Sequence, residues 1–228
     1  TETSKSLKTI KRLRETMMIQ TSKRLSTLVE WIDGTVLADI GCDHGYVAVN
    51  AILLEKVEKA YACDIAQGPL ENAKKTIHLY HVEEKVIPYL MNGIENLPED
   101  VDTIVIAGMG AKTIIEILSA SFGKLKKNMK LYLLPHKDVN ELRDYCSQNG
   151  IDILKETIIF EDNHFYPLLE CEISLTPYTM SDKEKEYGRH VIVSKEYKEF
   201  IQTELDKWSN ILKKVPVSRK IEIEKRLE

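Results

Sequence analysis

Five short apolar segments, four of them followed by a helical pattern, constrain the fold of this chain more than any other feature. They span residues 36–40, 59–63, 85–90, 102–107 and 130–134. Each is closed by Gly, Asp, Asn or Pro, the residues that typically form turns. Strands that alternate with helices predict a parallel sheet covered by helices, because parallel strands need a crossover connection.

The pattern changes after residue 150. Ile151–Phe160 and Phe165–Leu175 are both strand-like, and only the polar residues 161–164 separate them. Two strands joined by a short polar turn predict a β-hairpin. A plain dinucleotide-binding domain usually continues with further βαβ units instead, so the hairpin favours a different class of nucleotide-binding sheet.

The ends of the chain differ from its centre in charge. Residues 1–30 carry 7 Lys/Arg against 3 Asp/Glu, residues 31–177 carry 13 against 23, and residues 178–228 carry 12 against 10. We expect a basic N-terminal extension over 1–20, an α/β domain over 21–177 and a helical appendage over 178–228. The basic ends are either ordinary solvated surfaces or help to hold a polyanion.

Helical patterns flank the α/β domain. Ser22 predicts the N-cap of a helix that ends at Gly34. A second, long helix is expected from about Val191, and Arg219–Leu227 predicts another after the break at Pro216. The long helix has one apolar stripe, formed by Tyr197, Ile201, Leu205, Trp208, Leu212 and Val215. This stripe predicts either an antiparallel helical hairpin or docking of the long helix on the body.

Composition excludes several other classes. No apolar run reaches the ~18 residues of a transmembrane helix, and no signal-peptide core follows the basic start. The cysteines at 42, 63, 146 and 171 lack CxxC spacing, which argues against a zinc site and fits a reducing cytosol. We therefore expect a cytoplasmic monomer with no membrane segment and no metal.

The first strand is followed by the motif D-x-G-x-D-x-G over Asp39–Gly45. Ligands of a parallel sheet bind beyond the carboxyl ends of its strands. Gly41 lets the backbone approach a ligand closely. The carboxylates of Asp39 and Asp43 would repel a pyrophosphate but suit an amino group and a sulfonium. The motif therefore favours S-adenosylmethionine over NAD.

Later strand ends extend this site. Asp64 lies 19 residues after Gly45, where an acid accepts hydrogen bonds from ribose hydroxyls. The Asn92 amide suits an adenine edge, because it both donates and accepts. Each residue alone is an ordinary turn signal, and only their order along the chain indicates a cofactor site. The predicted cofactor-binding residues are Asp39, Gly41, Cys42, Asp43, His44, Gly45, Asp64, Ile65, Asn92, Gly93, Gly108 and Met109.

The chain resembles the bacterial TrmK family of class I S-adenosylmethionine-dependent methyltransferases over about residues 20–228. The similar motifs are Leu37–Tyr46, Ile104–Gly110, Leu133–Pro135, Asn140–Arg143 and Ile158–Asp162. The resemblance implies a Rossmann-like sheet, mostly parallel, with seven strands, a C-terminal hairpin and a helical, coiled-coil-like appendage. It also implies methylation of N1 of adenine 22 in the tRNA D-arm, with S-adenosylhomocysteine as the product.

Two positions depart from that family. Asn92 stands where an acid is common, and the His136 position often carries another residue. The stretch Ala107–Gly110 also lacks the aromatic signature of exocyclic-amine methyltransferases and offers no side-chain acceptor. We therefore predict Asp43 and His44 as acceptor or orienting groups, and Tyr46 as a wall of the methyl pocket. The alternative for His44 is a purely structural role in its loop.

An adenine in a tRNA arm must be turned out of its stack, and backbone contacts elsewhere must offset that cost. The predicted RNA-binding residues are Lys23, Arg24, Lys124, Lys126 and Lys127. The lysine cluster could instead serve solubility. Two other functions stay open: a methyltransferase for another RNA site, a protein or a small molecule, and a non-catalytic RNA-binding protein.

Overall fold

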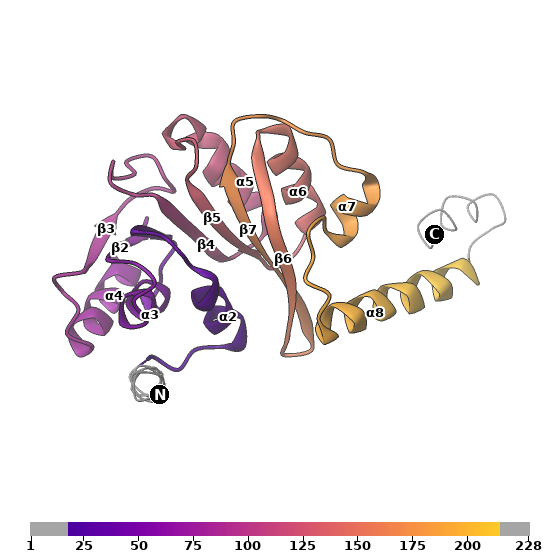
Figure 1. The fold of residues 1–228 in the computed structure, drawn as a ribbon. Coiled ribbons are helices and arrows are strands. Elements are labelled where there is room, and N and C mark those ends of the chain that lie inside the picture. The colour runs from indigo at the N-terminus through magenta and orange to yellow at the C-terminus, as the bar shows by residue number, and fades with distance from the viewer. Residues whose placement is uncertain (1–17, 215–228) are drawn as a thin grey trace, which may run out of the picture.

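A computed structural model of the chain describes residues 18–214 (Figure 1). Its described part contains one seven-stranded sheet in the order β3-β2-β1-β4-β5-β7-β6. The strands are β1 (Val36–Ile40), β2 (Lys59–Asp64), β3 (Val86–Leu90), β4 (Thr103–Met109), β5 (Lys130–Pro135), β6 (Ile151–Glu161) and β7 (His164–Ile173). The strands β1 to β5 are parallel, and β7 runs antiparallel to β5 and β6. The predicted sheet and hairpin are confirmed.

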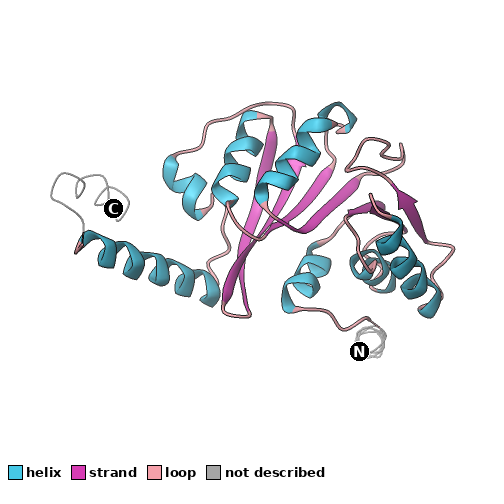
Figure 2. Cartoon of the chain, turned by 180° about the vertical axis from the view of Figure 1, so that it is seen from behind, coloured by secondary structure: helices cyan, strands magenta, loops and turns pink. Residues whose placement is uncertain are grey.

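Helices cover both faces of the sheet (Figures 1 and 2). They are α2 (Lys23–Trp31), α3 (Tyr46–Leu53), α4 (Gln67–Leu79), α5 (Ala111–Ala120), α6 (Val139–Gln148), α7 (Asp182–Tyr187) and α8 (Lys195–Leu212), with the 3-10 turn η1 (Phe122–Lys124). The side chains of β4 alternate between two cores: Ile104 and Ile106 pack with α5 and α6, and Val105 packs with α2, α3 and α4. Burial on both faces explains why the strands are almost continuously apolar.

The start of α2 agrees with its sequence signal, but its end does not. The Ser22 side chain accepts a hydrogen bond from the Leu25 amide at 3.4 Å, so Ser22 is the N-cap. The helix ends at Trp31, before the predicted stop at Gly34. Packing explains this glycine instead, since a Cβ at residue 34 would lie 2.0 Å from Thr103 Oγ1.

The hairpin turn is tighter than predicted. Glu161 and His164 still pair across the strands, so only Asp162 and Asn163 form the turn. Their φ angles are 49° and 57°. Two-residue turns with positive φ at both positions match the right-handed twist of a hairpin, and Asp and Asn tolerate this conformation.

The C-terminal part contains an unpredicted helix. A capping box between Ser181 and Glu184 starts α7. The long helix α8 begins at Lys195 rather than near Val191, because Val191 forms an isolated bridge with Glu156 of β6. Residues 188–192 thus form an extended strap between α7 and α8.

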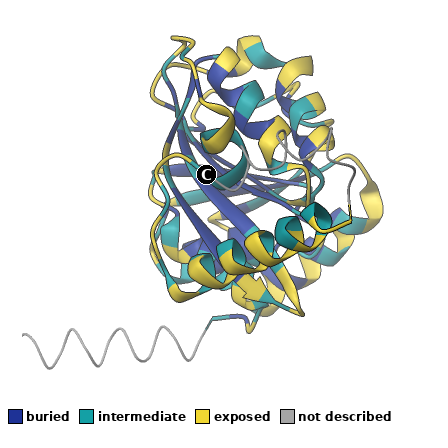
Figure 3. Cartoon of the chain, turned by 90° about the vertical axis from the view of Figure 1, so that its right-hand side faces the viewer, coloured by how far each residue is buried: buried dark blue, intermediate teal, exposed yellow. Residues whose placement is uncertain are grey.

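The amino-terminal turns of α8 dock on the hairpin and on α7. The rings of Phe200 and Phe165 meet edge to face at 5.6 Å, and the Tyr197 hydroxyl donates to the Tyr187 carbonyl at 3.2 Å. The rest of α8 points away from the sheet (Figure 1), and α8 has no buried residue (Figure 3). Val215 and the second helical segment predicted over Arg219–Leu227 lie outside the described residues. None of the helices described here has the length and apolar character needed to cross a bilayer.

Candidate functional site: two adjoining hollows at the carboxyl edge of the sheet

The turn after β1 lies where the strand order reverses, between β2 and β4. The amides of Gly41 and Cys42 both donate to the Cys63 carbonyl, at 2.9 and 3.0 Å. Gly41 has φ 74°, a left-handed conformation that glycine adopts without strain. A Cβ at this position would also lie 2.2 Å from Cε of Met109. The positive φ therefore favours glycine at residue 41, and any side chain there would also displace the flexible end of Met109.

Asp39 lies under this turn with only 3% of its surface exposed. The Ala48 amide of α3 donates to its Oδ2 at 3.3 Å. Burial raises the pKa of Asp39 to about 7, the hydrogen bond from Ala48 opposes this shift, and the nearby Asp64 adds to it. A positively charged group bound beside Asp39 would restore its ionised form.

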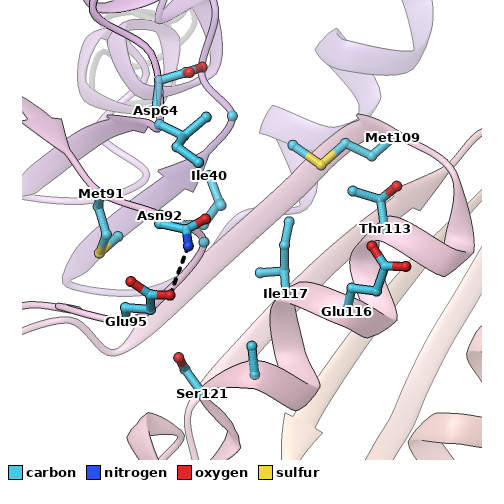
Figure 4. A pocket seen from close by; sticks show the side chains of 14 residues that line it. Ile40, Asp64, Met91, Asn92, Glu95, Met109, Thr113, Glu116, Ile117 and Ser121 are labelled. Atoms are coloured by element: carbon cyan, nitrogen blue, oxygen red, sulfur yellow. Dashed lines mark hydrogen bonds between the residues drawn. The ribbon is translucent and has the colours of Figure 1, made fainter.

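A hollow of about 420 Å³ opens between the ends of β2 and β3 and helix α5 (Figure 4). We call it the α5 hollow. Asn92 and Glu95 lie on one side and Glu116 and Ile117 on the other (Figure 4). The Asn92 amide donates to Glu95 Oε1 at 2.7 Å, which fixes the orientation of Asn92 and leaves its carbonyl oxygen as an acceptor. Asp64 Oδ1 accepts from the Ala66 amide at 2.9 Å.

A second hollow of about 340 Å³ lies between the β1 turn and α2, and we call it the α2 hollow. Its lining includes Arg24, Asp39, Asp43, His44 and Tyr46. The rings of His44 and Tyr46 stack with centroids 5.2 Å apart. His44 Nε2 lies 3.5 Å from Asp43 Oδ2. An imidazole, a phenol and a carboxylate are therefore available beside this hollow.

The two hollows share Gly41 and Met109 in their linings. The pairing of β4 with β5 is irregular between Ala107 and Met109. Gly108 has φ 77° at this irregularity, and β-bulges re-aim the side chains around them. Met109 thereby lies across Gly41, at the boundary between the hollows.

A family model described as a methyltransferase domain matches residues 21–169. The tRNA (adenine(22)-N(1))-methyltransferase of Bacillus subtilis (strain 168) is 33% identical over 156 residues, which cover 68% of this chain and 66% of that relative. The solved structure of M. capricolum TrmK in complex with S-adenosyl-homocysteine has a TM-score of 0.77 and 28% identity, covering 92% of this chain and 95% of that one. The chain belongs to the TrmK family of methyltransferases.

A second solved TrmK structure, the B. subtilis m1A22 tRNA methyltransferase, superposes with a TM-score of 0.72 at 26% identity, covering 91% of this chain and 96% of that one. The similarity therefore extends beyond the part that the family model matches. It reaches the C-terminal appendage as well as the sheet.

Most residues predicted for a TrmK-type cofactor site line one of the two hollows. Asp64, Ile65, Asn92 and Gly93 line the α5 hollow. Asp39, Cys42, Asp43, His44 and Gly108 line the α2 hollow, and Gly41 and Met109 line both. Gly45 lines neither and supports the loop from behind, where a Cβ would lie 3.1 Å from Cβ of Ala73.

The predicted RNA-binding residues separate into two groups. Lys23 and Arg24 lie in the first turn of α2; Arg24 lines the α2 hollow, whereas Lys23 Nζ lies 3.1 Å from Glu196 Oε1 of α8. The group Lys124, Lys126 and Lys127 precedes β5, at the amino edge of the sheet, where Lys126 Nζ donates to the Glu99 carbonyl at 2.9 Å. Because both hollows open at the carboxyl edge, the structure does not bring these lysines to the site.

Sequence reasoning missed the α5 wall of the α5 hollow. Thr113, Glu116, Ile117 and Ala120 all line it, and they lie at helical spacings of three and four residues. Spacing alone places them on one face of α5. Only the three-dimensional structure shows that this face meets Asn92 rather than the core.

Proposed function

We propose that this protein transfers a methyl group from S-adenosylmethionine to N1 of adenine 22 in tRNA. The observation that most supports this is the contact between the two hollows at Gly41 and Met109. The adenosine part of the cofactor would lie in the α5 hollow, and its methionine part would pass Gly41 to reach Asp39 in the α2 hollow, where it would adjoin the target base. The name of the B. subtilis relative supplies the nucleotide and the atom.

The side chains of this chain fit S-adenosylmethionine. Asp64 ends β2, where it would accept hydrogen bonds from the ribose hydroxyls. The carbonyl oxygen of Asn92 would accept one from the adenine amino group of the cofactor. Asp39, whose pKa burial raises to about 7, would become a counter-charge for the ammonium group of the cofactor.

S-adenosylmethionine supplies a methyl group on a positively charged sulfur. N1 of adenine has a lone pair at neutral pH, so no residue has to create a nucleophile. The main tasks of the protein are to orient N1 and to exclude water. The stacked rings of His44 and Tyr46 would form a wall of the base site. Asp43 would stabilise the positive charge that adenine acquires and accept a proton from its amino group.

The tRNA would extend beyond the α2 hollow. Arg24 lines this hollow, and Lys23 precedes Arg24 in α2, so both would contact the phosphate backbone. The appendage over 178–228 would hold a more distant part of the tRNA, since α8 points away from the body (Figure 1). We place this activity in the cytoplasm, where tRNA is available and where the free thiols of Cys42, Cys63, Cys146 and Cys171 stay reduced.

Methyl transfer can be tested with labelled S-adenosylmethionine and unmodified tRNA. The wild-type protein should label the tRNA, and the Asp39→Ala variant should lose both cofactor binding and labelling. Gln148→Ala is a matched control at the far end of α6. Labelling of a protein or a small molecule but not of tRNA, or the absence of cofactor binding in calorimetry, would contradict the proposal.

A further inference from the structure

A cluster of aromatic and charged side chains meets the α2 hollow at Arg24, and the reaction proposed above gives its aromatic members no role. Arg24 of α2 belongs to both the hollow and the cluster. Its Cζ lies 4.7 Å from the ring centroid of Tyr166 in β7. The rings of His136, after β5, and His164, in β7, lie 5.7 and 5.3 Å from the Tyr166 ring. Arg24 of α2 and His136 after β5 therefore meet Tyr166 and His164 of β7.

Arg24 covers the face of Tyr166 but is weakly held there. Its Nη1 lies 3.5 Å from Glu161 Oε2, and no hydrogen bond satisfies that oxygen within the described residues. The other oxygen of Glu161 accepts from the backbone amide of Lys23. A long ion pair and one cation–π contact are small restraints, so a stronger anion could draw Arg24 off the ring.

His136 adds an unsatisfied polar atom to the cluster. Its Nε2 is buried and finds no hydrogen-bond partner in the part of the chain that the structure describes. Burial lowers the pKa of His136, and electrostatic interactions with Arg24 and His164 lower it further, so the His136 ring is neutral at pH 7. The backbone amide of His136 donates to the Met109 carbonyl at 2.9 Å, which ties this ring to the boundary of the two hollows.

We propose that Tyr166 is a stacking platform for one unstacked RNA nucleotide next to the target adenine. The base of this nucleotide lies on the Tyr166 ring, and Arg24 moves from the ring to its phosphate. His136 contacts the edge of the base through Nε2. An aromatic face beside a guanidinium matches the two parts of a nucleotide, a π surface and an anion. The inference rests on the proposed function, because it places this nucleotide beside the base that is methylated.

The test compares Tyr166→Leu with Tyr166→Phe, which keeps the aromatic ring. The tRNA dissociation constant should rise roughly 5- to 150-fold in the leucine variant, the range that loss of one base–aromatic stack produces. It should change by less than about twofold in the phenylalanine variant, and both variants should bind S-adenosylmethionine like the wild type. Wild-type tRNA affinity in a Tyr166→Leu protein with normal cofactor affinity would overturn the proposal.

A second measurement applies if Tyr166→Leu does not fold. In Tyr166→Trp, tRNA should quench the new indole fluorescence beyond any change in the wild type, which contains Trp31 and Trp208. Unchanged fluorescence on tRNA binding would refute the stacking platform. These results are separable from the proposed function. If the wild-type protein does not methylate tRNA, the proposed function is wrong. If it does, and substitutions of Tyr166 do not change tRNA binding, only the stacking platform is wrong.

The role of Arg24 is tested by the salt dependence of tRNA binding. In Arg24→Gln the slope of log K against log salt should decrease by about one, as expected for the loss of one phosphate contact. Lys74→Gln removes an equal charge from α4, where Lys74 pairs with Glu71, and should leave the slope unchanged. An unchanged slope in Arg24→Gln would contradict the movement of Arg24 to a phosphate.

Discussion

At the scale of single residues, Asp39 couples cofactor binding to pH. Its pKa of about 7 lies above the usual 3.8, so the residue is mostly protonated below pH 7 in the cofactor-free protein. The ammonium group of the cofactor needs the carboxylate, so binding must release this proton. The affinity should therefore rise with pH through 7, by up to about tenfold per pH unit on the acid side. Calorimetry at about pH 6, 7 and 8 measures this.

Asp39→Asn is the control for this pH dependence. The amide keeps the shape of the side chain but cannot ionise, so the variant should bind more weakly and with a flat pH profile. If the wild-type affinity is equally flat between pH 6 and 8, Asp39 is not the counter-charge of the cofactor.

Gly41 is the second residue with a specific requirement. Gly41→Ala introduces a Cβ 2.2 Å from Met109 Cε and forces an L side chain into φ 74°. Backbone strain of this kind costs about 1–3 kcal/mol, and both hollows include Gly41, so cofactor binding should fall as well. Urea denaturation and calorimetry measure the two effects. Gly123→Ala is the matched control, because a Cβ there would have no atom within 4 Å.

At the scale of elements, a buried ion pair fixes the strap that leads to α8. Arg143 of α6 contacts Glu156 Oε2 of β6 through Nε and Nη2, both at 2.8 Å, and each side chain is only 2% exposed. Arg143 also donates to the carbonyls of residues 185 and 186, while Glu156 Oε1 accepts from the Arg189 amide. The pair therefore joins α6, α7, the strap and β6.

Glu156→Gln should destabilise the protein by about 3–5 kcal/mol, because it leaves the Arg143 charge buried without a counter-charge. The free energy of unfolding in urea is the measurement. Glu199→Gln, which removes an exposed carboxylate that lies 3.5 Å from Lys195, should change stability by less than about 0.5 kcal/mol. Equal effects of the two substitutions on the free energy of unfolding would show that the buried Arg143–Glu156 ion pair does not hold the strap.

Local sequence signals were sufficient for some elements and not for others. The strand β4 was predictable because its residues are buried on both faces and form an apolar run. The N-cap role of Ser22 was predictable because a capping side chain bonds to an amide in the first turn of its own helix. The helix α7 was missed although Ser181 and Glu184 have capping-box spacing, since its six residues have no apolar stripe. The start of α8 was misplaced because Val191 pairs with Glu156, a contact that local spacing cannot reveal.

The site shows the same division. The positions of Asp39, Asp64 and Asn92 at one edge of the sheet were predictable, because each lies at or just after the carboxyl end of a parallel strand, while their roles in cofactor binding stay predictions. The α5 wall and Tyr166 were not, since their positions depend on how a helix and a hairpin pack against the sheet. Asp43, His44 and Tyr46 lie together in the α2 hollow, and their catalytic roles stay predictions.

At the scale of the whole molecule, catalysis and tRNA binding should be separable along α8. A chain that ends at Thr203 keeps the contacts of Tyr197 and Phe200 with the body and removes everything beyond them. It should bind S-adenosylmethionine like the full chain, while its KM for tRNA increases. Steady-state kinetics measures the KM for tRNA, and calorimetry measures the affinity for S-adenosylmethionine. An unchanged KM in the shortened chain would exclude the distal part of α8 from tRNA binding.

The central claim concerns one atom of one nucleotide. Its most direct test is mass spectrometry of tRNA after incubation with this protein and S-adenosylmethionine, using two transcripts that differ only at nucleotide 22. We predict N1-methyladenosine at position 22 in the transcript with adenine there, and no methylation when guanine replaces it. Equal methylation of both transcripts, or a methyl group on another atom or nucleotide, would contradict this account.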